Sequence, residues 1–502
     1  MMLNSETNHS DFDKLQSQFS AQYAAIFDNR LTPKTIVVIP SLTLDHEILS
    51  KVKGHFYYEE RMLCMLMLLR MPETRITFVT SIPISPLIID YYLHMLPGIT
   101  PHHARNRLTL LSTYDSSNVP LTKKILNRPR LIQRIINSVP DAKAAHLVFF
   151  NTTDAERDLA LKLNIPMYSC DPKLNYLGSK SGSRVIFKES GIDLPDGIEH
   201  LNTLDDIVHA LVSLKCANRK ITKAVVKMNE GFSGDGNAIF TYPDLHFTDE
   251  DLITYLKSNI ESHLKIVAKK LSLKHFLQKF EAMGGIVEAF VEGTHIQSPS
   301  VQCRINPLGE ICVISTHDQV LGGESSQVFV GANFPADAEY AVELSNISYK
   351  IAARLRDKGV LGRFGVDFMS VKIDNGWKHY AIEINLRKGG TTHPFLMLQF
   401  LTDGHYDPST GKYKTQDGRD RYYFATDNLK NERYKGLTPL DLIDIAMYHG
   451  LHYDHSKVEG VMFHLISALS QYGKLGLVSI ADSPTKAIAN YEKVIEVLNA
   501  ET

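Results

Sequence analysis

The stretch that decides the fold is residues 361–394, which read LGRFGVDFMSVKIDNGWKHYAIEINLRKGGTTHP. Two runs of alternating apolar and polar residues, 365–373 and 377–386, flank Asp374-Asn375-Gly376. An Asn-Gly pair between two such runs is a strong β-hairpin signal. The pattern therefore predicts two antiparallel strands, with Gly376 at positive φ closing a three-residue turn.

Three side chains that carry oxygen ligands lie in this hairpin: Asp367 in the first run, and Glu383 and Asn385 in the second. Residues i and i+2 of a strand face the same side, so Glu383 and Asn385 point together. The three-residue turn places Asp367 opposite Glu383, as would an internal bulge, whereas a tight Asn-Gly turn would face Asp367 the other way. Two carboxylates and an amide oxygen suit Mg²⁺, which phosphates and water usually complete. We therefore predict a metal site here; the alternative is a surface hairpin whose acids face water.

The composition is that of an ordinary globular protein. The 502 residues suffice for about two to four domains, and 44% of them are hydrophobic and 22% charged. The net charge of −2 provides no general attraction to nucleic acid or to an anionic membrane. Five scattered cysteines show neither metal-ligand nor disulfide spacing, and the polar N-terminus lacks a signal-peptide pattern, so we expect a cytoplasmic protein. The longest apolar run, residues 62–69, is far shorter than the ~20 residues that span a bilayer. It predicts a buried helix.

Short apolar runs alternate with helical patterns in the first third of the chain, at residues 35–40, 76–80, 108–112 and 146–151. This alternation predicts a parallel sheet covered by helices on both faces. No GxGxxG follows the first run, so we predict no dinucleotide site there. We divide the α/β chain into four parts: a leader and helix at 1–30, a Rossmann-like domain at 31–178, a domain carrying the hairpin at 179–430, and a C-terminal α/β domain at 431–502.

Three other features of the sequence have an expected structure. Residues 404–428 are polar and rich in Tyr, Asp and Gly, and we expect a long loop or small lobe near the site. His464 lies in an apolar strand, where a hydrogen-bonded core histidine is more common than a ligand. The basic residues between 123 and 134 are expected to form a solvated helix face.

A glycine-rich segment, residues 230–237, follows a predicted strand that carries Lys227. Glycine amides can approach phosphate oxygens closely, although the Walker form GxxxxGK[ST] is absent. Together with Lys180 upstream, the segment favours a nucleotide clamp over a flexible hairpin loop. The strand at 285–292 could offer backbone donors and acceptors to a flat base.

Cations, glycines and hydroxyls follow the hairpin at residues 387–393. The guanidinium of Arg387 and the amides of Gly389 and Gly390 could stabilise a tetrahedral oxyanion. The next three side chains either contact a substrate carboxylate or cap the strand exit. These are Thr391, Thr392 and His393.

Five motifs in this order resemble the ATP-grasp superfamily of carboxylate–amine ligases, and most closely its pheganomycin-type peptide ligases. They are GSKSGSRVIF at 178–187, KMNEGFSGDGN at 227–237, SPSVQ at 298–302, HDQ at 317–319 and EINLRKGGTTHP at 383–394. Residues 451–498 also resemble the C-terminal domain of that family. The resemblance covers about residues 170–500 and identifies 179–430 as an ATP-grasp domain, preceded by a Rossmann-like α/β domain.

The resemblance implies a role for each matching residue. ATP phosphates would be bound by Lys180 and Lys227 under a closing loop, whose residues include Gly231, Ser233, Gly234, Gly236 and Asn237. The adenine edge would lie against residues 288–291, of which we single out Glu288, Ala289 and Val291. Magnesium would be held by Asp367, Glu383 and Asn385. Substrate would meet Arg387, Lys388, Gly389, Gly390, Thr391, Thr392 and His393.

Catalysis is assigned to Lys227 and Arg387. D-alanine ligase-like members carry an arginine two residues before the metal-binding aspartate, where this chain has Gly365, so the oxyanion role passes to Arg387. The resemblance implies an enzyme that uses ATP and Mg²⁺ to activate a carboxylate as an acylphosphate and couple it to an amine of an amino acid or peptide. Two alternatives are an ATP-binding regulatory or scaffold protein without turnover, and a ligase with a non-amine acceptor. We expect small-molecule or peptide substrates, no nucleic acid or membrane partner, and leave a homodimer open.

Overall fold

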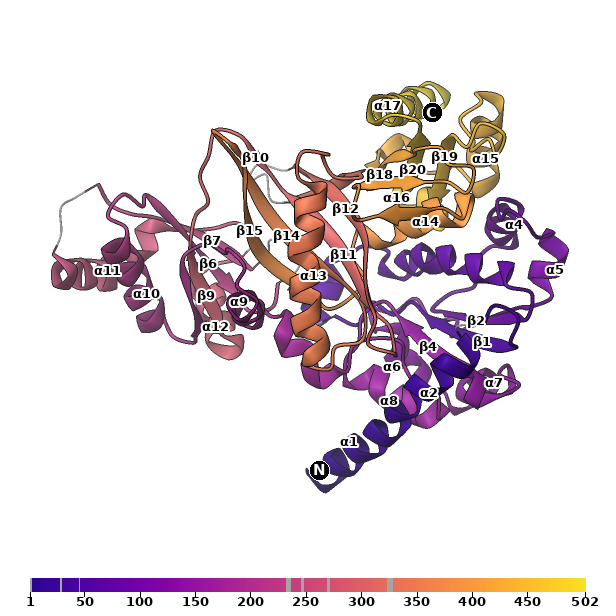
Figure 1. Cartoon of the computed structure of the whole chain (residues 1–502), viewed down its shortest axis with the longest axis horizontal. Coiled ribbons are helices and arrows are strands. Elements are labelled where there is room, and N and C mark those ends of the chain that lie inside the picture. Colours follow the sequence, from indigo (N-terminus) through magenta and orange to yellow (C-terminus); the bar gives the residue numbers. More distant parts are fainter. Residues whose placement is uncertain are drawn as a thin grey trace.

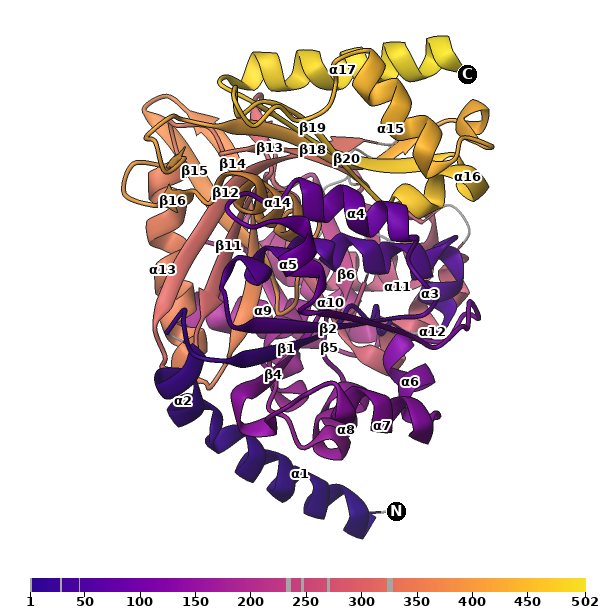
Figure 2. The same cartoon turned by 90° about the vertical axis from the view of Figure 1, so that its right-hand side faces the viewer.

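Figures 1 and 2 show the computed structural model of the chain. The residues it describes are 2–27, 29–44, 46–231, 236–244, 248–268, 271–322 and 328–502. Within these ranges the strands form sheets of four, five and nine strands and one two-stranded ribbon. The predicted mixture of a parallel α/β sheet with antiparallel sheets is confirmed.

The first domain is a four-stranded, all-parallel sheet in the order β3-β2-β1-β4. Its strands are β1 (Lys34–Ile39), β2 (Thr74–Thr80), β3 (Leu108–Ser112) and β4 (Ala145–Phe149). Strands β1 and β4 are buried along their whole length, as expected for continuous apolar runs covered on both faces. The helices between them are α3 (His46–Lys51), η2 (His55–Arg70), α4 (Pro86–His94), α5 (Pro101–Arg105), α6 (Leu121–Leu126), α7 (Pro129–Asn137), η3 (Ala142–Ala144) and α8 (Asp154–Leu163).

The helix η2 is a 3₁₀ helix over the apolar run that predicted a buried helix. Its Met62, Leu63, Leu66 and Leu69 are at most 2% exposed, so the predicted burial is confirmed. Just before them, η2 also buries three charged residues, Glu59, Glu60 and Arg61. Among the helices of the described ranges, none is long and apolar enough to cross a membrane.

The predicted single helix at the N-terminus is three segments instead. These are α1 (Met2–Ser17), α2 (Phe19–Gln22) and the π-helical η1 (Tyr23–Phe27). The break lies where Phe19 packs among rings of the first domain, with centroids 5.7 Å from His146 and 5.9 Å from Tyr168. The first half of α1 projects away from the body of the molecule in both views (Figures 1 and 2).

The five-stranded antiparallel sheet, in the order β5-β9-β6-β7-β8, forms a lobe at one end of the molecule (Figure 1). Its strands are β5 (Gly197–Leu201), β6 (Lys223–Met228), β7 (Asn237–Thr241), β8 (Leu264–Ile266) and β9 (Gly285–Ala289). Helices α10 (Leu204–Ala217), α11 (Asp249–His263) and α12 (Leu273–Met283) belong to the same lobe. The chain enters it through η4 (Pro172–Gly178) and α9 (Lys180–Glu189).

The nine-stranded sheet runs through the middle of the molecule, with α13 (Ala341–Asp357) along one face (Figure 1). It follows the order β10-β14-β11-β12-β13-β18-β20-β19, with β15 also paired to β14. The strands are β10 (Ile296–Gln297), β11 (Pro299–Ile305), β12 (Ile311–Gly322), β13 (Val328–Phe334), β14 (Gly362–Ile373), β15 (Gly376–Asn385), β18 (Tyr422–Lys430), β19 (Gly460–His464) and β20 (Lys474–Ala481).

The segment expected to be a long loop at 404–428 contains strands. A small ribbon, β16 (His405–Asp407) with β17 (Lys412–Lys414), is followed by β18, which joins the central sheet. Strands β19 and β20 of the predicted C-terminal domain continue the same sheet, and the boundary at 430/431 stays a prediction. The helices of this part are α14 (Thr392–Thr402), α15 (Pro439–Tyr448), α16 (Leu469–Tyr472) and α17 (Pro484–Glu501), with η5 (Glu432–Tyr434) and η6 (Ile466–Ala468).

One hydrophobic core joins the first domain to the C-terminal part. Leu63 of η2, Phe395 of α14 and Met462 of β19 belong to the same cluster of buried side chains. The two parts lie side by side in both views (Figures 1 and 2). Since fully burying such side chains stabilises by about 1.5–3 kcal/mol each, this contact fixes η2 against β18 and α14. The cleft described next is lined by residues of the five-stranded and nine-stranded sheets and by Tyr58, Arg61 and Phe150 of the first domain.

Candidate active site

The hairpin of β14 and β15 places Asp367 directly opposite Glu383, as predicted. This register does not arise from the expected three-residue turn. Ile373 pairs with Gly376, which leaves a two-residue turn, and the extra residue is Ile382, at a bulge between the pairs Asp367–Glu383 and Phe368–Ala381. The internal bulge shifts the register by one residue and so brings the acids onto one side. Gly376 has the predicted positive φ, at 116°.

The predicted metal ligands lie together on the wall of a cleft of about 830 Å³. Asp367 accepts hydrogen bonds from Asn385 Nδ2 (2.9 Å, at Oδ2) and from Gln319 Nε2 (3.1 Å, at Oδ1). Glu383 forms an ion pair with Lys180, with 2.5 Å between Oε1 and Nζ. The three predicted ligands and Lys180 therefore form two neighbouring pairs on this wall, Asp367 with Asn385 and Glu383 with Lys180.

The two carboxylates of this group lie close enough to share a cation. Burial, and then the nearby charge of Glu383, raise the pKa of Asp367 to about 6. Burial also opposes ionisation of Glu383, but Lys180, Arg387 and Lys227 outweigh it and lower the pKa of Glu383. Two neighbouring carboxylates, one of them with a pKa raised mainly by burial, lie beside an amide and form an oxygen-rich donor set that fits Mg²⁺.

Lys227 on β6 is held by an ion pair with the buried carboxylate of Glu288 on β9. The other oxygen of Glu288 pairs with Arg184 of α9, 3.0 Å from Nη1. Lys227 and Glu288 both line the cleft. The predicted adenine-side residue Glu288 thus positions the cationic Lys227 through its side chain.

Helix α9 carries Lys180 into the cleft and begins at a tight contact. Ser179 caps the helix by accepting a hydrogen bond from the N–H of Gly182 (3.0 Å). A Cβ at Gly182 would lie 2.0 Å from the carbonyl oxygen of Tyr176. Glycine is therefore required here by close approach of the backbone, and this fixes the start of the helix beside β15.

The opposite end of the cleft is lined by the end of β9 and the glycine-rich segment. Ala289 and Val291 line it, with Phe290 between them, as do Gly231, Gly236 and Asn237. The N–H groups of Ala289 and Phe290 donate to the carbonyls of Asp196 and Lys223. The two remaining predicted loop residues, Ser233 and Gly234, lie outside the described residues.

The segment after β15 divides between the cleft and its supporting structure. Four of its predicted substrate-binding residues line the cleft: Arg387, Gly389, Gly390 and Thr391. Burial lowers the pKa of Arg387, opposed by the charges of Glu383 and Asp367. This guanidinium thus lies close to both carboxylates, as its predicted role requires.

The other three predicted substrate-binding residues, Lys388, Thr392 and His393, are not among those that line the cleft, and their contact with substrate stays a prediction. Lys388 donates from Nζ to the carbonyl of Phe149, and burial lowers its pKa to about 7. Thr392 donates to Gln302 Oε1 (2.9 Å) and accepts the N–H of Gly389 (2.9 Å). His393 contacts Asp427. Helix α14 begins at Thr392 and buries the side chains of Thr392 and His393.

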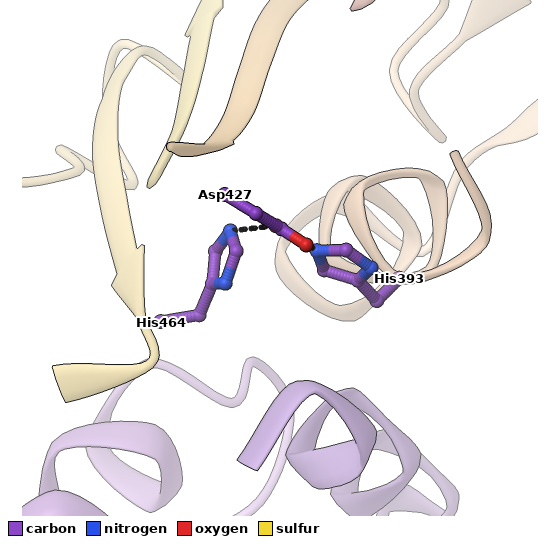
Figure 3. A group of neighbouring side chains, drawn as sticks. All are labelled: His393, Asp427 and His464. Carbon is purple, nitrogen blue, oxygen red and sulfur yellow. Dashed lines mark hydrogen bonds and ion pairs between the residues drawn. The ribbon is translucent and has the colours of Figure 1, made fainter. Parts of the chain in front are cut away.

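Figure 3 shows a buried group of three side chains, His393, Asp427 and His464, of which Asp427 lines the cleft. Asp427 Oδ1 lies 2.9 Å from His393 Nε2 and 3.6 Å from His464 Nε2. His464 is fully buried as predicted, but it is not hydrogen-bonded as expected, since neither ring nitrogen has a hydrogen-bond partner in the described part of the chain. Burial lowers its pKa to about 3, so it is neutral.

Sequence reasoning missed several residues of the cleft. Arg61 of η2 and Asp427 and Asn428 of β18 line it. A signal existed for the first: three consecutive charged residues precede an apolar run that must be buried, and a buried charge needs a partner. For Asp427 and Asn428 the signal is the strand pattern of residues 422–430, which overlaps the segment that we expected to be a long loop or small lobe.

The chain resembles known ATP-grasp proteins along most of its length. Residues 172–270 and 250–409 match the family model "IQCH-like, ATP-grasp", and residues 441–493 match "PGM1 C-terminal domain". The chain belongs to the ATP-grasp superfamily. The predicted resemblance to its pheganomycin-type ligases is also confirmed. The chain is 29% identical, over 92% of its length and 94% of the relative's, to L-propargylglycine–L-glutamate ligase of Streptantibioticus cattleyicolor.

Other ATP-grasp proteins are more distant. The chain is 20% identical to IQ motif-containing protein H of Danio rerio, over 93% of the chain but only 48% of that protein. The fold matches the ADP complex of N5-carboxyaminoimidazole ribonucleotide synthetase (TM-score 0.53, 13% identity, 94% and 98% of the two chains). It also matches a biotin carboxylase from Campylobacter jejuni (TM-score 0.54, 14% identity, 91% and 89%). At these identities the two structures establish the ATP-grasp fold alone.

Proposed function

We propose that the protein is an ATP-dependent ligase that activates a carboxylate as an acylphosphate and joins it to an amine. The observation that carries this proposal is the arrangement of charges in the cleft. Two adjacent carboxylates, Asp367 and Glu383, are surrounded by the cations Lys180, Lys227 and Arg387. Among the described lining residues there is no cysteine and no histidine. The site is thus built to neutralise and position phosphate groups rather than to attack a substrate covalently.

This chemistry suits the reaction because a carboxylate does not react with an amine unaided. Transfer of the γ-phosphoryl group of ATP to the carboxylate forms an acylphosphate, and the amine then displaces inorganic phosphate. Phosphoryl transfer depends mainly on alignment and charge neutralisation. In our proposal Lys180 and Lys227 bind the ATP phosphates, and Arg387 with the Gly390 amide faces the oxyanion of the tetrahedral intermediate.

We propose that Asp367, Glu383 and Asn385 bind Mg²⁺. Bound there, the ion would supply positive charge that offsets the negative charge developing during phosphoryl transfer. In the structure Lys180 pairs with Glu383, and the Asn385 amide donates to Asp367. The Asn385 side chain must rotate to present its oxygen, because amide nitrogens donate and do not ligate hard cations.

The relative with 29% identity suggests the substrate class. Its name records the joining of L-propargylglycine to L-glutamate, and the alignment runs through almost the entire length of both chains. We therefore propose amino acids, or a peptide, as the carboxylate and amine substrates. The adenine is proposed to lie against residues 288–291. Whether two chains form a homodimer stays open, and a cytoplasmic location stays a prediction.

The test is a substrate screen on the full chain. Purified protein is incubated with ATP, Mg²⁺ and the proteinogenic amino acids, singly and in pairs, and ADP release and product masses are recorded. We expect ADP release for particular pairs, with a product equal in mass to the pair minus one water. Asp367→Asn is the inactive reference. ATP binding without turnover for any pair would favour the regulatory or scaffold protein, and an ester or thioester product would establish a non-amine acceptor.

A further inference from the structure

Arg61 and Asp427 form a pair of opposite charges on the wall of the cleft. Arg61 comes from η2 of the first domain and Asp427 from β18 of the central sheet, and both line the cleft. Arg61 is close enough to Arg387 to lower its pKa, and Arg387 in turn lies close to Asp367 and Glu383. The pair therefore borders the place where we propose that the acylphosphate forms.

The guanidinium of Arg61 is held in a fixed orientation. Its carbon lies 4.7 Å from the ring centroids of both Tyr58 and Phe150, and these two rings also line the cleft. Nε donates to the carbonyl of Tyr58 (3.3 Å) and Nη1 to Asp427 Oδ2 (3.2 Å). No hydrogen bond from Nη2 occurs within the described residues. An arginine fixed in this way keeps donors for a planar, bidentate anion such as a carboxylate.

Asp427 is kept ionised although it is buried. Burial opposes ionisation, but the hydrogen-bonded His393 and the charge of Arg61 outweigh it and lower the pKa of Asp427. Figure 3 shows the two imidazoles on either side of its carboxylate. A carboxylate has about four acceptor positions, and these contacts leave capacity for one more donor from the cleft. The pairing with Arg61 makes a metal cation an unsuitable occupant, because Arg61 already offsets the charge of this carboxylate.

We propose that this pair binds the acceptor substrate as a free α-amino acid, with its carboxylate on Arg61 and its amino group on Asp427. The amino acid carries a negative carboxylate and a positive ammonium group, and these charges are opposite to those of Arg61 and Asp427. The carboxylate on Arg61 must differ from the one that is phosphorylated, because that group has to lie near Arg387 and the two metal-binding carboxylates. This inference rests on the proposed function and specifies the substrate class of the same cleft.

The test compares the acceptor found in the substrate screen with its C-terminal amide. We expect the wild-type protein to prefer the free acid by about 10- to 100-fold in kcat/KM, the range for a hydrogen bond to a charged group. Arg61→Met should reduce this preference to near unity, while the KM for ATP changes by less than about twofold. Arg61→Lys, which keeps the charge without the planar fork, should fall between. Asp427→Asn should raise the acceptor KM.

A matched control exists on the same helix. Arg70 of η2 also forms an ion pair across to the end of α14, 2.9 Å from Asp403, but this pair is only half-buried and Arg70 does not line the cleft. Arg70→Met should therefore leave the preference for the free acid unchanged, and a thermal melt of each variant confirms folding.

Three results would overturn the inference. If wild-type protein releases no ADP with any pair, the proposed function fails and this subsite with it. If wild-type protein turns over but a folded Arg61→Met or Arg61→Lys variant keeps the full preference, only the subsite is refuted and the pair is structural. A stoichiometric metal ion that is lost in Asp427→Asn would instead make Asp427 a metal ligand.

Discussion

Replacing Glu383 by glutamine tests the carboxylate pair most sharply, because it keeps the shape of the side chain and removes its charge. In the structure Glu383 pairs with Lys180 and lies opposite Asp367. The substitution removes the interaction between the Glu383 carboxylate and the shared cation. For unit charges about 4 Å apart, at an effective dielectric of about 20, this interaction amounts to about 4 kcal/mol. At about 1.4 kcal/mol per decade this corresponds to a loss of roughly 10³-fold in kcat.

The same substitution should shift the pH dependence. Burial and the charge of Glu383 raise the pKa of Asp367 to about 6, so activity of the wild-type protein should fall as the pH falls through about 6 and Asp367 takes up a proton. In Glu383→Gln the repulsion is absent. The pKa of Asp367 should then be lower, and the acidic limb of the kcat/KM profile should move to lower pH.

The assay is steady-state ADP release at several Mg²⁺ concentrations between pH 5 and pH 8. Excess Mg²⁺ should restore activity only in part. Glu339→Gln is the control, since Glu339 is an exposed glutamate that pairs with Lys372 of β14 outside the cleft. Activity of Glu383→Gln within a few-fold of the wild type, or an unmoved acidic limb, would refute the shared-cation account.

Three further predictions follow from single contacts. Lys227→Met should weaken ATP binding at least tenfold and nearly abolish turnover without unfolding the chain; unchanged affinity in a fluorescent-nucleotide titration would remove Lys227 from the ATP site. The pKa of Lys388 is lowered to about 7 by burial, so the folded state binds fewer protons than the unfolded state between pH 7 and about 10.5, and stability should rise with pH across that window. Lys388→Met should flatten this rise in urea denaturation while leaving the substrate KM unchanged; a raised KM would return Lys388 to the site. Gly182→Ala should destabilise the fold by about 1–3 kcal/mol, because its Cβ would overlap the Tyr176 carbonyl; an unchanged melting temperature would contradict this contact.

The hairpin shows how far sequence patterns reach. Alternation in residues 365–373 and 377–386 predicted two strands, and the need for a common ligand face predicted Asp367 opposite Glu383. The sequence pattern did not predict that the extra residue is Ile382, because an Asn-Gly pair reports only on the turn itself. The bulge at Ile382 forms where β14 is also paired with β11, so that Asp367 lies between Glu383 and Ser300. Cross-strand pairing of three strands, rather than the turn, determines it.

The parts of the site that sequence could not supply come from long-range packing. Arg61 and Asp427 are 366 residues apart, and only the core shared by η2, α14 and β19 brings their elements together. Lys388 looked like a ligand in the sequence because it follows Arg387. In the fold its side chain meets the end of β4 instead, since successive residues leaving a strand point in different directions.

Transfer of oxygen from the substrate tests the central claim most directly. The acceptor and donor found in the screen are incubated with the protein, ATP and Mg²⁺, with the donor carboxylate labelled with ¹⁸O, and the released phosphate is analysed by mass spectrometry. Activation as an acylphosphate predicts ADP and one ¹⁸O atom in each inorganic phosphate, because the amine displaces the carboxylate oxygen together with the phosphoryl group. Unlabelled phosphate, or the release of AMP that carries the ¹⁸O label, would contradict the account.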